Sequence, residues 1–381
     1  MSKKLIADVF LEAAKALETG SFLSKPKIGL TTFGSEHGQE MMIQAANLAK
    51  SDLFDIVLIG DPGESEFETI VVADDKEGHK KMEELLDSGE LDACVTMHYD
   101  FPIGVSTVGR VVTPARGREL ILATTTGTSA LNRVEAMVKN TVAGIAVAKS
   151  LNIKEPKVGI LNIDGAKQTE QILKKMRDNG YPVSFAESMR ADGGVAMRGN
   201  DLLQASCDVM VTDSLTGNLL MKLFSSYTTG GDYEAMGYGY GPGVGEGYGR
   251  KVFIISRASG APVVANALKY AYDIVKGNLE KHAKEEYSLA GKANMMDLIR
   301  QVTDKKSENK GEEVTAPPKE VVTGAIAGVD VLDLDDALKH LWKHGIYAES
   351  GMGCTGPIVM VKESNVDKSI ELLKEGNFVA D

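Results

Sequence analysis

Cys354 lies among glycines near the end of the chain, in the stretch Ser350–Pro357. A cysteine thiolate attacks acyl groups, and the unobstructed N–H groups of a glycine turn can stabilise the thiolate or the oxyanion that its attack produces. We therefore predict that Cys354 is a nucleophile for acyl transfer. A tight glycine turn that happens to hold a cysteine is the alternative. The glycines that would supply the N–H groups are Gly351, Gly353 and Gly356.

A second candidate site lies in the stretch Asp208–Lys222. The apolar run Val209–Val211 predicts a short buried strand, and a polar turn then leads into the periodic apolar residues of a helix. In an open parallel sheet, ligands sit at strand ends, and a helix N-terminus there suits an anion. We interpret the stretch as an anion-binding turn, although an ordinary capped helix has the same pattern. The candidate phosphate-binding residues are Thr216, Gly217, Asn218 and Lys222.

Ser256 and Arg257 end another apolar run. An arginine at a strand end can hold phosphate or an acyl-phosphate oxygen in a forked geometry, whereas a surface arginine that caps its own loop is equally compatible with the pattern. The hydroxyl-rich stretch Thr124–Ser129 fits an anion-binding loop or a capping segment. The six histidines form no metal-ligand pattern, so no metal site is predicted.

The other two cysteines, Cys94 and Cys207, lie within or beside apolar runs, where a buried and inert thiol is expected. Three cysteines that are far apart form no disulfide framework, which predicts a reducing cytoplasm. The net charge of −12 disfavours nucleic acid and anionic membranes as partners. No apolar run is long enough to span a bilayer, and the first residues do not resemble a signal peptide.

Strands that alternate with helices predict a parallel sheet covered by helices on both faces. Two long helices, Val134–Leu151 and Val263–Ala283, are suited to flank a domain boundary. We expect one α/β domain from residues 1–150 and 258–302 and a second from residues 151–257. The expected strands include Lys27–Thr31, Asp55–Gly60, Ala93–Met97, Leu120–Ala123, Lys157–Ile163, Val209–Val211 and Lys251–Ser256.

Glycines and tyrosines alternate between Gly230 and Gly249, and this composition predicts neither a helix nor a packed central strand. A mobile lid over a site and a long surface loop are both compatible with it. The glycines do not follow a strand as a dinucleotide-binding motif requires. The charged residues 303–318 end in Pro-Pro and predict a linker. Residues 319–381 then form a predicted small α+β module that carries Cys354.

The motifs, taken together, resemble known enzyme families. The stretch Thr212–Lys222 resembles the Asp-Gly-Phe-x-Gly-Asn-x-x-x-Lys signature of phosphate acyltransferases of phospholipid synthesis. Ser256-Arg257, before a glycine and a helix, resembles the active-site Ser-Arg pair of phosphate acetyltransferases. Including Gly-Met-Gly-Cys-Thr-Gly-Pro around Cys354, the whole chain resembles the alpha subunits of component C of glycine reductase and of its sarcosine and betaine counterparts. The resemblance implies a two-domain fold of the phosphate acetyltransferase or isocitrate dehydrogenase-like type.

This resemblance also implies an activity and partners. Component C takes a two-carbon unit from a selenoprotein, component A, and releases acetyl phosphate in amino-acid-fermenting anaerobes. Its beta subunit resembles thiolases. We therefore expect an oligomeric cytoplasmic enzyme that uses inorganic phosphate, without a cofactor, to cleave an acetyl thioester on Cys354 or on the partner subunit. Ser256 and Arg257 are its expected catalytic residues beside Cys354.

One difference from phosphate acetyltransferases affects the mechanism. Those enzymes carry an aspartate a few residues past Ser-Arg that acts as a base on coenzyme A, and here Ala261–Val264 occupies that region. We interpret the change as the loss of a need to activate free coenzyme A. A free-standing phosphate acetyltransferase and a catalytically inactive structural subunit are the alternatives. The sequence does not distinguish glycine, sarcosine and betaine as the source of the acetyl group. It also does not determine the subunit stoichiometry.

Overall fold

The computed structural model describes residues 25–61, 63–189, 193–303, 314–329, 333–353, 356–376 and 378–379, with the backbone alone at 352, 353, 356 and 357. These residues form two compact units. The first comprises the described parts of Met1–Leu161 and Tyr181–Lys292, and the second those of Asn162–Gly180 and Ala293–Asp381. Cys354 and residues 304–313 of the predicted linker lie outside the described residues.

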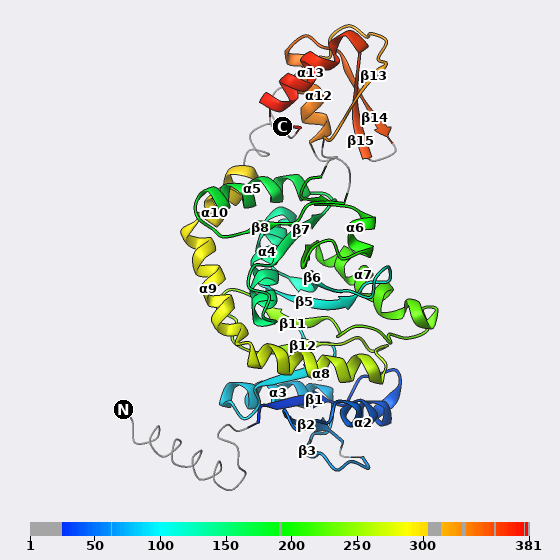
Figure 1. Ribbon diagram of the computed structural model, residues 1–381, viewed down its shortest axis with the longest axis vertical. Helices are drawn as coiled ribbons and strands as arrows, with labels where there is room; N and C mark the ends of the chain where they lie inside the picture. Colours follow the sequence, from blue (N-terminus) through cyan, green and yellow to red (C-terminus); the bar gives the residue numbers. More distant parts are fainter. Residues whose placement is uncertain are drawn as a thin grey trace. The chain divides into compact units, whose positions relative to one another are not determined.

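The first unit is built on one large sheet with the order β3-β2-β1-β4-β12-β11-β5-β6-β10-β7-β8, to which β9 adds beside β7 (Figure 1). Most neighbours are parallel, and the antiparallel pairs are β12–β11, β11–β5 and β5–β6. The strands are β1 Lys27–Thr31, β2 Asp55–Gly60, β3 Glu68–Val71, β4 Ala93–Thr96, β5 Val105–Val112, β6 Glu119–Thr128, β7 Lys157–Leu161, β8 Ser184–Phe185, β9 Ala196–Met197, β10 Val209–Val211, β11 Gly241–Val244 and β12 Val252–Ile254.

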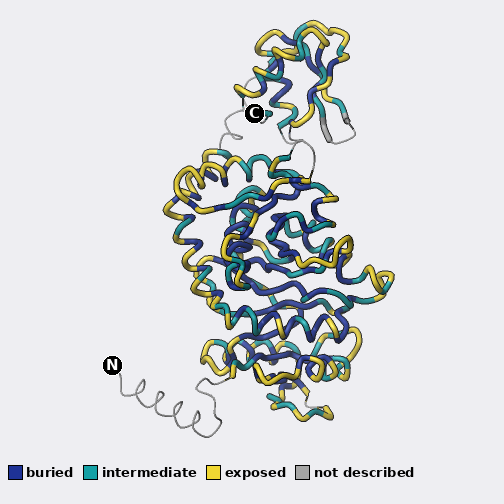
Figure 2. Tube along the Cα trace, viewed as in Figure 1, coloured by how far each residue is buried: buried dark blue, intermediate teal, exposed yellow. Residues whose placement is uncertain are grey.

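Helices cover both faces of this sheet, and the predicted mixed α/β class is confirmed. The central strands are buried along most of their length, which explains their nearly continuous apolar sequences (Figure 2). The helices of the unit are α2 Gly38–Ala49, α3 Asp75–Ser88, α4 Arg133–Ser150, α6 Gly199–Leu203, α7 Ser214–Ser226, α8 Ala261–Lys276 and α9 Leu279–Lys292, with a 3-10 turn η1 at Tyr227–Thr229. None of the helices within the described ranges is long and apolar enough to cross a membrane.

Strand β11 corrects the sequence-based view of the glycine- and tyrosine-rich stretch. Gly241–Val244 is a buried strand in the middle of the sheet, where Gly241 and Pro242 pair with β12 and Gly243 and Val244 pair with β5. A Cβ atom on Gly241 would lie 1.8 Å from the carbonyl oxygen of Val108. The glycines therefore permit close packing of neighbouring chain segments, and composition alone does not reveal this.

The predicted division of the chain at residues 150 and 258 stays a prediction. Strands β5 and β6, from the first predicted domain, pair with β11 and β10, from the second. One hydrogen-bonded sheet therefore runs across those boundaries.

The second unit contains helices α5 (Ala166–Asp178) and α10 (Met295–Thr303). It also contains the small C-terminal α+β module that the sequence predicted. Its antiparallel sheet has the order β13-β15-β14 and pairs Gly353 of β14 with Gly356 of β15. Apolar residues of its strands and helices form a separate core, including Val359, Val361 and Leu341. The elements of the module are β13 Gly324–Ala327, α12 Leu334–Lys343, β14 Ala348–Gly353, β15 Gly356–Val361, η3 Glu363–Asn365 and α13 Val366–Glu375.

Candidate functional site

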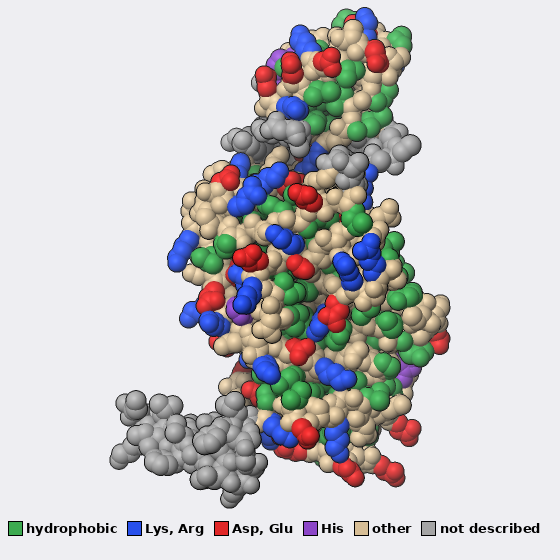
Figure 3. Space-filling view, viewed as in Figure 1, with side chains coloured by type: hydrophobic (Ala, Val, Ile, Leu, Met, Phe, Trp, Pro, Cys, Tyr) green, Lys and Arg blue, Asp and Glu red, His purple; other side chains and the backbone are tan. Residues whose placement is uncertain are grey.

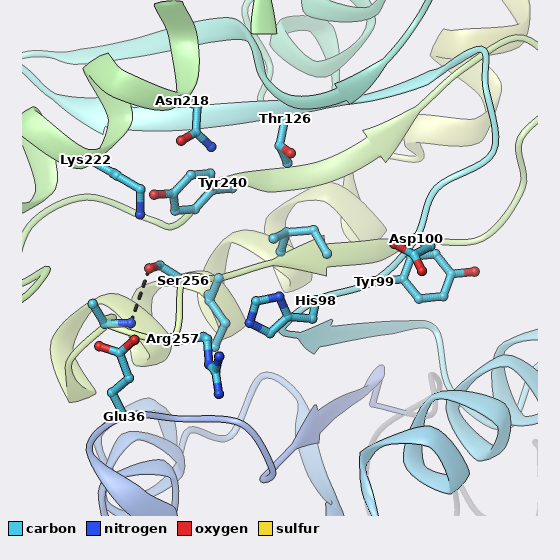
Figure 4. A pocket seen from close by; sticks show the side chains of 13 residues that line it. Glu36, His98, Tyr99, Asp100, Thr126, Asn218, Lys222, Tyr240, Ser256 and Arg257 are labelled. Carbon is cyan, nitrogen blue, oxygen red and sulfur yellow. Dashed lines mark hydrogen bonds between the residues drawn. The ribbon is translucent and has the colours of Figure 1, made fainter. Parts of the chain in front are cut away.

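A cavity of about 410 Å³ in the first unit brings together several predicted site residues (Figure 4). Strands β1, β4 and β12 are parallel, so the segments that follow them meet at one edge of the sheet. Strand β6 and helix α7 contribute from the other half of the sheet. The lining residues are Glu36, His98, Tyr99, Asp100, Thr126, Asn218, Lys222, Tyr240, Ile254, Ile255, Ser256, Arg257 and Ala258.

Arg257 is tied to the loop after β1 by two hydrogen bonds. Its Nε–H donates to the carbonyl oxygen of Gly34 at 3.1 Å, and its own carbonyl accepts the N–H of Glu36 at 3.0 Å. No ion pair or hydrogen bond joins its two terminal guanidinium nitrogens to another residue in the described part of the chain. The guanidinium is therefore held by one edge, and its remaining donors can bind an anion in a fork.

The turn that carries Arg257 is fixed by two serine hydroxyls. The hydroxyl of Ser256 accepts the N–H of Ala258 at 3.2 Å, and the hydroxyl of Ser259 accepts the N–H of Ser256 at 3.1 Å. Ser256 lines the cavity, whereas Ser259 is buried behind it. The turn thus contributes a hydroxyl and a guanidinium to the lining of one cavity.

Helix α7 places two of its four predicted residues in the cavity lining, Asn218 and Lys222, which lie one turn apart. The Asn218 amide also donates to the carbonyl oxygen of Thr125 at 3.2 Å. Lys222 is half exposed, and its ammonium lies 5.8 Å from the centre of the Tyr240 ring. An amide and a cation from α7 therefore face the Ser256-Arg257 turn across the cavity (Figure 4).

Thr216 and Gly217 are not among the lining residues, and their contact with phosphate stays a prediction. The Asp213 carboxylate caps α7, accepting the N–H of Thr216 at 2.8 Å and its hydroxyl at 3.1 Å. A negative cap already occupies the helix N-terminus that an anion would need. Gly217 packs so tightly that a Cβ atom would lie 1.7 Å from the carbonyl oxygen of Thr124.

The buried carboxylate of Glu234 supports both sides of the cavity. It accepts the hydroxyl of Tyr240 at 2.9 Å and that of Ser259 at 2.8 Å, and it lies 3.9 Å from the Lys222 ammonium. Burial, together with this neighbouring carboxylate, raises the pKa of Tyr240 well above its usual range. Glu234 comes from the glycine- and tyrosine-rich stretch, which therefore contributes a supporting residue to the site.

Sequence reasoning missed several lining residues, among them Glu36, His98 and Tyr240. Glu36 and His98 follow the predicted strands Lys27–Thr31 and Ala93–Met97, so the rule that ligands gather beyond parallel strand ends could have found them. Thr126 lies in the hydroxyl-rich stretch Thr124–Ser129, for which an anion-binding loop is one of the two interpretations. Tyr240 lies in the glycine- and tyrosine-rich stretch, where nothing in the local sequence distinguishes it from the other tyrosines.

Two of the three cysteines are buried, as predicted. Cys94 is fully buried and Cys207 is 6% exposed. Burial raises the pKa of the Cys207 thiol to about 12 and moves that of Cys94 further in the same direction. Both groups therefore remain protonated and poorly nucleophilic at neutral pH. In the ranges that the structure describes, no cluster of three potential metal ligands is present.

Comparisons with known proteins give three findings. A family model described as a fatty acid synthesis protein matches residues 26–360. The glycine/sarcosine/betaine reductase complex component C subunit alpha of Peptoclostridium acidaminophilum is 59% identical over 381 residues, 99% of each chain. A phosphate acyltransferase of Fervidobacterium nodosum is 27% identical over 146 residues, 38% of this chain and 42% of that protein.

Among solved structures, a branched-chain phosphotransacylase from Enterococcus faecalis has a TM-score of 0.46 at 16% identity, covering 66% of this chain and 99% of that one. The family model spans most of the chain, and the reductase subunit matches it from end to end. The chain therefore belongs to the fatty acid synthesis protein family and, within it, to the alpha subunits of component C of glycine/sarcosine/betaine reductase complexes.

Proposed function

We propose that this chain is the acyl-transfer subunit of a component C complex and that it makes acetyl phosphate by phosphorolysis of an enzyme-bound acetyl thioester. The observation that carries the proposal is the cavity that Arg257, Lys222 and Ser256 line together, with the Ser256 hydroxyl drawn between the Lys222 ammonium and the Arg257 guanidinium (Figure 4). Two cations, a hydroxyl and an amide suit a phosphate dianion next to a small uncharged acyl group.

In the proposed reaction, an oxygen of inorganic phosphate attacks the carbonyl carbon of the thioester. The tetrahedral intermediate then collapses, the carbon–sulfur bond breaks, and acetyl phosphate and the sulfur group are released. Arg257 binds phosphate through its free guanidinium edge, and Lys222 offsets the charge that develops on oxygen. The reaction requires no cofactor beyond phosphate as substrate. We propose Cys354 as the thiol that carries the acetyl group.

The relationship to a component C alpha subunit supports a set of partners. These are a thiolase-like beta subunit and the selenoprotein component A, which would deliver the two-carbon unit. We propose that the chain works in a cytoplasmic oligomer with them. The phosphate acyltransferase similarity supports the same class of reaction, transfer of an acyl group to phosphate.

Labelled acetyl phosphate tests this proposal. The full-length chain, incubated with acetyl phosphate that carries an isotope in its acetyl group, should acquire a thioester on Cys354, which peptide mapping locates. Cys354→Ala and Cys354→Ser should abolish arsenate-dependent breakdown of acetyl phosphate, whereas Cys94→Ala and Cys207→Ala should retain it. Breakdown by Cys354→Ala at the wild-type rate would remove this cysteine from the reaction. Exchange that requires coenzyme A would favour a free-standing acetyltransferase.

A further inference from the structure

A proton donated to the departing sulfur assists the cleavage of a thioester by phosphate. A neutral thiol leaves more easily than a thiolate from a tetrahedral intermediate, and the reverse reaction needs a base to take the same proton. The chain after Arg257 cannot supply it, because Ala261, Val263 and Val264 are apolar and buried in α8. The acid must therefore come from another residue that lines the cavity.

Most titratable side chains that line the cavity cannot donate a proton to the sulfur. The Tyr99 hydroxyl donates to Glu83 at 2.6 Å and the Tyr240 hydroxyl to Glu234 at 2.9 Å, and burial raises the pKa of both tyrosines. Arg257 binds phosphate in the proposed reaction, and a carboxylate accepts hydrogen bonds but has no proton to donate. Lys222 is paired with the buried acid beside it. The exposed carboxylates are those of Glu36 and Asp100.

His98 remains, and an imidazole is the side chain that best carries a proton at neutral pH. It is exposed and lines the cavity, and Figure 4 shows its ring on the side towards Arg257, with Tyr99 and Asp100 farther from Arg257. Its ring nitrogens make no hydrogen bond to any other residue that the structure describes. Both nitrogens are therefore available to a substrate.

The conformation of His98 and the contacts of its two chain neighbours fix the position of its side chain. Its φ of 50° is an uncommon, left-handed conformation for a residue other than glycine. Just before it, the carbonyl of Met97 lies 2.9 Å from Nε2 of His79, and just after it the Tyr99 ring packs edge-on against Phe101. This left-handed residue comes two positions after the end of β4, and its imidazole is exposed to solvent.

From this arrangement we infer that His98 is a catalytic acid and base of the thioester site. The inference rests on the proposed function. As phosphate attacks and the carbon–sulfur bond breaks, the His98 imidazolium gives its proton to the departing sulfur, which leaves as a thiol. In the reverse reaction the neutral imidazole takes the thiol proton as sulfur attacks acetyl phosphate. No oxidant or further reactant is needed.

A chemical rescue experiment tests this role. His98→Gly removes the imidazole, and glycine adopts the positive φ of this position without strain. In the arsenate-dependent breakdown of acetyl phosphate by the full-length chain, we expect the turnover number to fall about 100- to 10,000-fold, the usual contribution of a general acid or base. Added imidazole should restore turnover, and substituted imidazoles should do so in proportion to their basicity. His282→Gly, at a surface position of α9, is the matched control for added imidazole.

The outcomes separate this inference from the proposed function. Unchanged turnover in His98→Gly, or a loss that no imidazole restores in a protein with wild-type thermal stability, would overturn the role of His98 while leaving acetyl phosphate chemistry intact. A wild-type chain that never breaks down acetyl phosphate with arsenate would overturn the proposed function and the inference together.

Discussion

The ammonium of Lys222 lies 3.9 Å from the carboxylate of Glu234, and the two side chains differ sharply in exposure, 53% for the lysine and 4% for the acid. A loose pair of this kind contributes little binding energy of its own. It does, however, reduce the positive charge that Lys222 presents to the cavity. Arg257 has no carboxylate partner within the described residues and therefore supplies the stronger anion-binding group.

Arg257→Ala should weaken the use of phosphate or arsenate. Loss of charged hydrogen bonds costs about 1.5–3 kcal/mol, which corresponds to a KM for phosphate raised by roughly 10- to 150-fold. Lys222→Ala should have a smaller effect, because Glu234 already offsets part of the lysine charge. Steady-state kinetics at varied phosphate concentration measure both. Arg116→Ala, at an exposed position before β6, is the control, and a wild-type KM in Arg257→Ala would exclude this arginine from the phosphate site.

Glu234→Gln should destabilise the protein and loosen the site. The carboxylate accepts two hydroxyl donors, and the NH₂ of glutamine would face one of them as a second donor. A buried polar group without its partner costs about 1–3 kcal/mol, which urea denaturation detects. Glu246→Gln, at an exposed position of the same stretch, should change the free energy of unfolding by less than about 0.5 kcal/mol. Equal stability of the two variants would contradict a supporting role for Glu234.

Gly217→Ala should lower stability because the new methyl group would meet the carbonyl oxygen of Thr124 at 1.7 Å. Backbone atoms cannot turn aside as a flexible side chain can, so α7 must shift, at a cost of about 1–3 kcal/mol. Gly291→Ala in α9 meets nothing within 4 Å and should instead stabilise that helix by up to about 1 kcal/mol. Thermal denaturation of both variants checks the contrast, and a Gly217→Ala protein as stable as wild type would show that this contact is easily relieved.

Asp201 should make the free energy of unfolding depend on pH. Burial opposes its ionisation, but hydrogen bonds from the N–H groups of Arg198 and Met189 and the hydroxyl of Ser188 outweigh it and lower the pKa of the carboxyl. A lowered folded-state pKa gives stability that is present above the unfolded pKa of about 3.9 and is lost as the pH falls below it. Asp201→Asn should therefore cost about 1–3 kcal/mol at pH 7. The difference from wild type should shrink below about pH 4 in urea titrations, and a constant difference would exclude the charge as its cause.

The sequence alone determined most of the elements and the chemical character of several site residues. The predicted strands Lys27–Thr31, Asp55–Gly60 and Val209–Val211 have the same bounds in the structure, and the polar residues before Leu215 begin a helix as expected. Short continuous apolar runs predict buried strands, because a strand covered on both faces of the sheet needs nonpolar side chains on both faces. The inert state of Cys94 and Cys207 followed from the same pattern.

Tertiary structure decided which residues share the cavity. Thr124–Thr128 continues strand β6 instead of forming the expected loop, and Gly241–Val244 is a central strand. Glu36, His98 and Arg257 meet because three parallel strands end at one edge, although more than 200 residues separate the first from the last. The spacing of apolar residues along one segment indicates only which of its faces are buried. The pairing of distant strands, and therefore the composition of the site, depends on close contacts that no single segment of the sequence specifies.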